Sequence, residues 1–193
     1  MLDKDSQQSC RLFAEILDYP GSSLLESATE CVNQLELSFP GGVKSLQSFV
    51  TFAKSQSPEM LEEIYVQTFD TTPATTLYFG YHLFGETPKR SAFMAKLQEA
   101  YQAHHFDGGT ELADHLCVML RFISVTQDRE FVIPLLRECI LPVIEKMEAA
   151  FPKNKNSYRP AVSSLGLFLR QAYKGLINAG GTQRVGVVPS SGM

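Results

Sequence analysis

The sequence predicts an all-α fold, a compact single-domain bundle or orthogonal array of roughly eight or more helices. Apolar residues recur at the spacing of one helical face in segment after segment of the chain. Proline and glycine stand between these segments, where helices end and begin. An alternating stretch such as residues 184–188 lies in a Gly-rich tail, and no Asn-Gly or Asp-Gly turn separates two such stretches, so we expect no sheet.

Four helices are expected before residue 70. The first covers residues 11–19 and ends at Pro20, because the residue before proline avoids the helical region. The second starts at Ser23, where Ser23 and Glu26 have the spacing of a capping box, and it ends before the loop at 39–42. The third covers residues 43–56. The fourth begins with Ser57 as N-cap and Pro58 in its first turn.

The C-terminal part continues the helical pattern. Thr87 and Pro88 start a helix that ends at the histidines 104–105, and a loop at 106–109 leads to residues 111–116, the acidic start of an apolar helix. Residues 128–150 are helical in period, and we expect a kink or a new helix at Pro142. A last amphipathic helix follows the polar loop 152–157. We therefore predict a helical domain at residues 1–174 and a flexible tail at residues 175–193.

Length, composition and charge narrow the class of protein. The chain has 193 residues, of which 44% are hydrophobic and 20% charged, which suits one domain with one sizeable core. The net charge is −4 and Lys and Arg do not cluster, so we expect a basic partner and not nucleic acid or an anionic membrane. No apolar run approaches the ~18 residues of a membrane span, and the N-terminus is too polar for a secretory signal. We expect a cytoplasmic protein without stable membrane insertion.

Residues 62–90 are rich in aromatic, acidic and imidazole side chains. Asp70 opens a short polar break, so two helices are expected to meet there at a corner. The aromatic and imidazole side chains either line a groove with apolar walls and a polar rim or pack in the core; they are Tyr65, Phe69, Tyr78, Phe79, Tyr81, His82 and Phe84. The pattern leaves both alternatives open.

Few residues are arranged for catalysis or cofactor binding. The sequence has no phosphate-cradling loop, dinucleotide fingerprint or nucleophile elbow, so we expect no cofactor and no common enzyme class. The best candidate for a metal site combines Asp107, Glu111 and His115, with the last two on one helical face; helix caps and ion pairs are the simpler explanation. The widely spaced cysteines are predicted to be buried thiols; they are Cys10, Cys31, Cys117 and Cys139.

Several motifs together resemble a known family. They are Tyr-Val-Gln-Thr-Phe-Asp at 65–70, His82 before Gly85-Glu86, Arg90 ahead of a helix with Tyr101, Glu-Leu-Ala-Asp-His-Leu at 111–116, and Leu-Arg-Phe at 120–122. In this order and spacing, over about residues 12–173, the chain resembles the delta-subunit chaperones of respiratory nitrate reductase, the NarJ group of the TorD/DmsD superfamily. The family commonly has proline where Ala113 and Cys117 stand and glycine where Ser91 stands. These differences leave open whether the client is nitrate reductase or a relative.

The resemblance implies a cytoplasmic all-helical chaperone and not an enzyme. Such a protein binds the N-terminal leader, often a twin-arginine signal, of a molybdopterin-containing catalytic subunit, supports insertion of the molybdenum cofactor, and releases the subunit for assembly or export. The implied peptide-binding residues are Tyr65, Phe69, Asp70, His82, Glu86, Arg90, Glu111, Asp114, His115 and Leu116. An amphipathic leader is expected to lay its apolar face in the aromatic groove, with acids near its arginines.

Two other functions stay open at this point. One is a helical adaptor subunit in a constitutive complex, and the other is a metal-dependent enzyme that uses Asp107, Glu111 and His115. The sequence also leaves open whether the protein is a monomer or a dimer.

Overall fold

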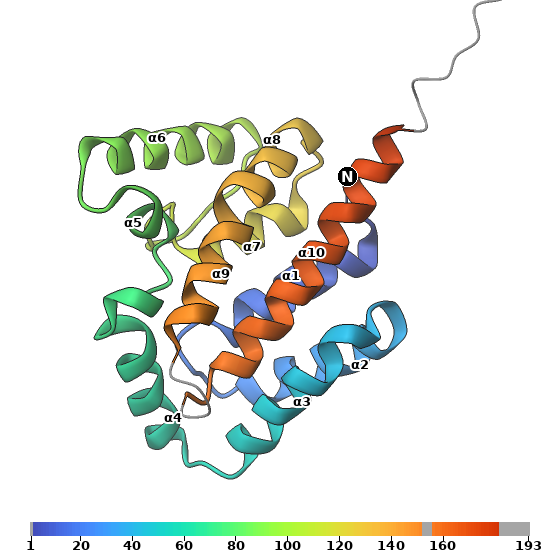
Figure 1. Ribbon diagram of the computed structural model, residues 1–193, viewed down its shortest axis with the longest axis vertical. Coiled ribbons are helices and arrows are strands. Elements are labelled where there is room, and N and C mark those ends of the chain that lie inside the picture. Colours follow the sequence, from blue (N-terminus) through green and yellow to red (C-terminus); the bar gives the residue numbers. More distant parts are fainter. Residues whose placement is uncertain (1, 152–155, 182–193) are drawn as a thin grey trace, which may run out of the picture.

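Helices form almost all of the regular structure in the computed structural model, which describes residues 2–151 and 156–181 (Figure 1). In these ranges the strand-like pairing is limited to one antiparallel bridge between Tyr78 and His115. The predicted all-α class is therefore confirmed. No helix within the described ranges is long and apolar enough to cross a membrane.

One half of the domain is built from α1 (Lys4–Ile16), α2 (Leu24–Ser38), α3 (Pro40–Lys54) and α10 (Arg159–Gly181). α1 packs against α2, α2 against α3, and α3 against α10. Figure 1 shows α10 crossing this half, with α2 and α3 to one side of it. Leu12, Phe49 and Leu165 are buried here, and removal of their apolar surface from water stabilises the packing.

The other half carries α4 (Pro58–Tyr65), α5 (Phe79–Phe84), α6 (Pro88–Ala103), α7 (Leu116–Val125), α8 (Arg129–Pro134) and α9 (Leu141–Ala150). α7 joins the two halves, because most of its residues are buried and it packs against α1. α6 is held more loosely: its fully buried residues are Leu97 and Tyr101. In Figure 1 it lies along the upper edge, away from α2 and α3.

The predicted helix starts at Ser57 and Thr87 are confirmed. Ser57 caps α4 through its hydroxyl, and Pro58 occupies the first turn. Pro88 likewise opens α6, although the Thr87 hydroxyl donates to the Phe84 carbonyl at 2.9 Å and does not cap the helix. Proline fits these positions because the first amides of a helix have no acceptor within it.

Three other helix starts differ from the prediction. α1 begins at Lys4 and not at residue 11, because the Asp3 carboxylate accepts a hydrogen bond from a first-turn amide. The predicted capping box at Ser23 is wrong, because Ser23 already has helical dihedral angles and makes no side-chain cap bond. α3 begins at Pro40 and not at residue 43, because proline is well suited to the first position of a helix.

Two π-helical turns lie directly before the breaks that the sequence predicts at Asp70 and Pro142. Val66–Asp70 continues α4 as a π turn, and Leu135–Ile140 joins α8 to α9. The second turn follows Pro134, whose ring removes a backbone donor and disfavours a regular helix. α9 then starts at Leu141 with Pro142 in its first turn, which confirms the predicted new helix. Single π turns inside helices are frequent at functional sites.

α10 extends through Gly181, past the domain boundary predicted at residue 174. Leu176 is 3% exposed and its carbonyl accepts a hydrogen bond from Arg129, so the additional turns pack against α8. These tertiary contacts outweigh the low helical propensity of the glycines in this segment. The rest of the predicted tail, residues 182–193, lies outside the described residues.

Tyr158 is the centre of an aromatic cluster under the α4 turn. Its ring centroid lies 5.0 Å from that of Phe49, 5.1 Å from Phe69 and 5.8 Å from Tyr65. The Tyr65 hydroxyl donates to the Leu17 carbonyl at 3.3 Å. The Tyr158 hydroxyl is buried and has no partner within the described ranges, an arrangement that destabilises the folded state.

Removal of the two tyrosine hydroxyls should therefore have different effects on stability. Tyr65→Phe leaves the Leu17 carbonyl without its donor and should lower the free energy of unfolding by about 0.5–1.5 kcal/mol. Tyr158→Phe removes an unpaired buried hydroxyl and should be neutral or stabilising. Urea unfolding followed by circular dichroism measures both values, and equal losses in the two variants would contradict this assignment.

Candidate functional site

A buried ion pair between Arg90 and Asp114 lies where α5, α6 and the start of α7 meet. Arg90 Nε donates to Asp114 Oδ2 at 2.7 Å, and Arg90 Nη2 donates to Oδ1 at 3.3 Å. The Asp114 side chain is fully buried and that of Arg90 is 15% exposed. The hydrogen bond to Asp114 raises the pKa of Arg90. Both carboxylate oxygens are satisfied, which a buried charge requires.

Gly80 provides the space that this ion pair occupies. A Cβ atom at position 80 would overlap Asp114 Oδ2 and would lie 3.1 Å from Arg90 Cγ. Any other residue here must displace the carboxylate or the helix. The close approach of the α5 backbone to the ion pair therefore requires glycine.

His115 and Tyr78 connect the start of α7 to the segment before α5. Their backbones form the isolated antiparallel bridge, and their rings pack edge-on with centroids 5.1 Å apart. His115 Nδ1 accepts a hydrogen bond from the Cys117 amide at 3.3 Å, so the imidazole caps α7. The Arg90 guanidinium lies 5.6 Å from the centre of the Tyr78 ring. Tyr78 is thus fixed from two sides.

A surface made of two tyrosines and three acidic residues lies above this junction. We call it the acidic aromatic surface, and its members are Tyr19, Glu62, Asp70, Tyr78 and Glu111. The Tyr78 hydroxyl donates to Glu111 Oε1 at 3.0 Å. Desolvation, this hydrogen bond and the charges of Glu111 and Asp70 raise the pKa of Tyr78 to about 12. Desolvation, a hydrogen bond with Glu62 and the charge of Asp70 raise the pKa of Tyr19. The charge of Asp70 therefore acts on both tyrosines.

The acidic aromatic surface is arranged to bind cationic groups. Tyr19 is 53% exposed, and its ring rests edge-on against Tyr65. Tyrosine rings attract cations through their π faces, and carboxylates accept charge-assisted hydrogen bonds. In the described part of the chain, Glu62, Asp70 and Glu111 form no ion pair with Lys, Arg or His. Their charge is available to a partner.

Nine of the ten residues implied by the resemblance fall into three groups, and His82 stands apart from them. Tyr65, Phe69 and Leu116 are buried, so the core alternative holds for them and they do not line an aromatic groove. The second group forms the junction beneath the acidic aromatic surface; it consists of Arg90, Asp114 and His115. Asp70, Glu86 and Glu111 are exposed. His82 is half-buried on α5, and its Nε2 atom lies 2.8 Å from the Thr76 carbonyl.

Sequence reasoning missed Tyr19 and Glu62, and also the ion pair between Asp18 and Arg121, whose charges act on His115. Tyr19 follows the end of α1 and Glu62 lies in α4, and packing alone brings them together. An exposed tyrosine next to Pro20, outside the apolar face of the predicted helix, was the available signal.

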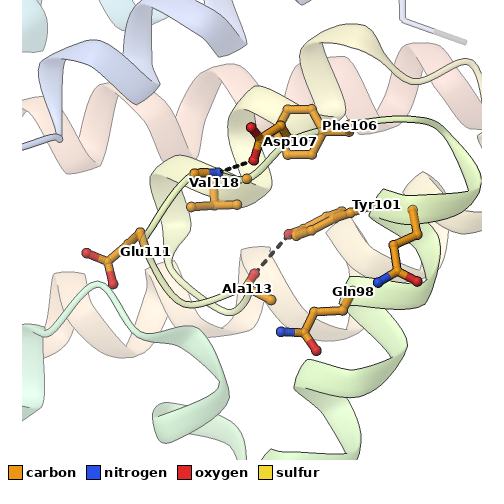
Figure 2. A pocket seen from close by; sticks show the side chains of 10 residues that line it. Gln98, Tyr101, Phe106, Asp107, Glu111, Ala113 and Val118 are labelled. Atoms are coloured by element: carbon orange, nitrogen blue, oxygen red, sulfur yellow. Dashed lines mark hydrogen bonds between the residues drawn. The ribbon is translucent and has the colours of Figure 1, made fainter.

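A hollow of about 330 Å³ lies beside this surface, between α6 and the loop before α7 (Figure 2). Tyr101, Phe106 and Val118 form its apolar wall, and the Tyr101 hydroxyl donates to the Ala113 carbonyl at 2.8 Å. Figure 2 shows the Glu111 carboxylate pointing away from the Tyr101 ring. The hollow therefore borders the acidic aromatic surface and shares Glu111 with it.

The alternative metal site at Asp107, Glu111 and His115 is not supported by the structure. Within the described ranges no group of three His, Cys, Asp or Glu side chains is placed to hold a metal ion. α7 begins at Leu116, so Glu111 and His115 do not share a helical face. Glu111 instead accepts from Tyr78, His115 caps α7, and Asp107 accepts from an amide of its own loop.

The fold and the site define a class: an all-helical protein that presents an acidic, aromatic surface to a partner. A crystal structure described as that of "A Putative Redox Enzyme Maturation Protein From Archaeoglobus Fulgidus" is similar to this chain with a TM-score of 0.55. The two sequences are 18% identical, and the match covers 89% of this chain and 93% of that one. At this identity the likeness shows the fold alone.

The chain belongs to the nitrate reductase delta subunit family, because the family's sequence model matches residues 36–161. This confirms the family indicated by the motifs. A curated relative is the "Probable nitrate reductase molybdenum cofactor assembly chaperone NarJ" of Bacillus subtilis (strain 168), which is 38% identical over 85 residues. The aligned residues are 44% of this chain and 46% of that protein, so the match spans about half the length of the relative.

Loss of one partner of the buried ion pair should be far more costly than loss of an exposed carboxylate. Asp114→Asn leaves Arg90 without its counter-charge and should lower the free energy of unfolding by about 3–5 kcal/mol. Gly80→Ala should also destabilise, because the added methyl overlaps the carboxylate. The control Asp70→Asn should change stability by less than about 0.5 kcal/mol. Urea unfolding measures all three, and an Asp114→Asn protein as stable as the parent would overturn this view of the junction.

His115 should make stability depend on pH. Burial lowers the pKa of His115, so the unfolded chain binds a proton more tightly than the folded one. The contribution of His115 to the free energy of unfolding is complete when the pH is above the pKa of the unfolded chain, about 6.5. This contribution declines as the pH falls below that value. His115→Asn keeps an acceptor for the Cys117 amide but removes the titration. The variant should lose less stability than the parent between about pH 7.5 and 5.5 in denaturant unfolding; identical losses would contradict this role.

Proposed function

We propose that this protein is a cytoplasmic assembly chaperone for the catalytic subunit of a molybdenum-containing oxidoreductase of the nitrate reductase kind. It binds the N-terminal leader of that subunit, holds the subunit until the molybdenum cofactor is inserted, and then releases it for assembly or export. It is not an enzyme and holds no cofactor of its own. The acidic aromatic surface is the observation that carries this proposal.

Family membership supports the class of client. The Bacillus subtilis relative is named as an assembly chaperone for nitrate reductase and its molybdenum cofactor. The match to the family model covers residues 36–161, which include α3 to α9 and four members of the acidic aromatic surface. Tyr19 lies outside the matched range.

The chemistry of the surface suits the basic end of a leader peptide. A guanidinium that enters near Asp70 meets the rings of Tyr19 and Tyr78, with Glu62 and Glu111 as further acceptors. One exposed ion pair contributes only about 0.2–1 kcal/mol. Several carboxylates and two rings must therefore act together to hold a leader with useful affinity, and this surface combines them.

The predicted peptide-binding residues have different roles in this proposal. Asp70 and Glu111 contact the leader directly, and Glu86 extends the negative charge beyond the end of α5. Arg90, Asp114 and His115 fix Tyr78 in place. Supporting residues beneath or beside the surface are Tyr65, Phe69, His82 and Leu116.

Calorimetry with leader peptides of molybdoenzyme catalytic subunits tests the proposal. Asp70→Asn and Glu111→Gln should each weaken binding about threefold to tenfold, which corresponds to about 0.7–1.4 kcal/mol. The loss should shrink at high salt, because the carboxylates act through screened charge. Glu26→Gln on α2 removes the same charge at an exposed site outside the surface and should bind like the parent.

The peptide itself provides the second control. Replacement of its arginines by glutamines should abolish the difference between the parent and the Asp70→Asn protein. A leader that binds all the variants equally would refute the assigned site.

A stable complex with the catalytic subunit that survives deletion of the leader would favour the adaptor function over the chaperone function.

A further inference from the structure

A second hollow, of about 310 Å³, lies on the other side of α6, against α8 and the π turn Leu135–Ile140. We call it the α6 groove. Six of its nine lining residues are apolar; they are Phe93, Leu97, Phe131, Pro134, Leu135 and Cys139. Its interior therefore favours apolar side chains.

One wall of the groove is α6, a helix with few buried residues, and the other includes the π turn that follows Pro134. On the α6 side, Phe93 is half-buried and packs against Phe84 at a centroid distance of 5.6 Å. On the opposite side, Pro134 ends the α-helical hydrogen bonding and the π turn follows. The π turn widens the helix, and Cys139 from this turn lines the groove.

The rim of the groove carries charge. Glu130 and Glu138 lie on the α8 side and Lys96 on the α6 side. Glu138 pairs with Arg137 at 2.5 Å. Among the described residues, Glu130 and Lys96 have no ion-pair partner. The α8 rim therefore presents an unpaired carboxylate beside an apolar floor, which is complementary to an apolar segment with a neighbouring basic residue.

Tyr65 and Phe69 are buried in the core, so they are not available to the apolar part of a leader. α6 connects the α6 groove with the junction beneath the acidic aromatic surface. Arg90 pairs with Asp114 beneath the acidic aromatic surface, and Phe93, about one turn further along the helix, lines the α6 groove.

We propose that the α6 groove binds the apolar face of a short helical segment in the client leader, while the acidic aromatic surface binds the arginines of the same leader. This inference rests on the proposed function. An amphipathic helix that lays its apolar face in a groove is a common mode of peptide recognition. The groove is at the small end of ligand pockets, so it takes about two or three apolar side chains and not a whole helix.

Cys139 offers a native probe of the groove. The other three cysteines are fully buried, so alkylation of the folded protein should modify Cys139 alone. Burial and the charge of Glu138 raise the pKa of Cys139 to about 11, so labelling with N-ethylmaleimide requires mildly alkaline buffer and long incubation. Mass spectrometry gives the rate and the site, and Cys139→Ser is the control that should not react.

The ligand in this experiment is a synthetic peptide with two arginines followed by leucines at positions i, i+3, i+4 and i+7. It should slow the alkylation of Cys139 at least fivefold, and protein alkylated at Cys139 should bind it about tenfold more weakly. Cys139→Ser protein should bind it normally before and after treatment with the reagent. A peptide with the same arginines but glutamines for leucines should give no protection.

The outcomes separate this inference from the proposed function. If the leucine peptide binds in calorimetry but leaves the alkylation rate unchanged, the groove assignment is wrong while leader binding stands. Leu25 lines a different hollow, between α2 and α4. If Leu25→Gln weakens binding of the peptide and alkylation of Cys139 does not, the apolar binding site is that hollow and not the α6 groove. If no leader peptide binds the unmodified protein, the proposed function fails and this inference fails with it.

Discussion

The paired charges of Arg90 and Asp114 hold together the part of the molecule that carries its function. The ion pair joins α6 to the start of α7, and Gly80 allows α5 to lie directly against it. A buried charge that loses its partner costs several kcal/mol, so these three segments are fixed relative to one another. Tyr78 is fixed in turn by the Arg90 guanidinium and the His115 ring, and its hydroxyl orients Glu111. The exposed surface thus depends on a buried contact.

Both proposed binding regions include a π turn. Val66–Asp70 ends with Asp70, the carboxylate that acts on Tyr19 and Tyr78. Leu135–Ile140 supplies one wall of the α6 groove. A π turn has poorer hydrogen-bond geometry than an α turn, so its persistence requires compensation from packing. At Leu135–Ile140 that compensation comes from Leu136 and Ile140, which are fully buried.

The aromatic residues that distinguish this sequence serve two separate purposes. Tyr65, Phe69 and Phe79 fill the core, where large rings bury apolar area. Tyr19 and Tyr78 remain partly exposed, each beside a carboxylate. The proposed apolar recognition then falls to the space around α6, a helix with few buried residues. A weakly embedded helix between two hollows suits a protein that must bind a flexible segment and later release it.

The sequence by itself determined the all-α class, the helix starts at Ser57, Thr87 and Pro142, and the family. These follow from local signals: the 3.6-residue period, the restricted dihedral angles of proline, and short motifs. Only the tertiary structure decided that Tyr65 and Phe69 are buried, that Tyr19 and Glu62 lie beside Asp70, and that Glu111 and His115 do not share a metal. The reason is that burial and adjacency depend on how segments distant in the chain pack together, and no local pattern records which neighbour each helical face will meet.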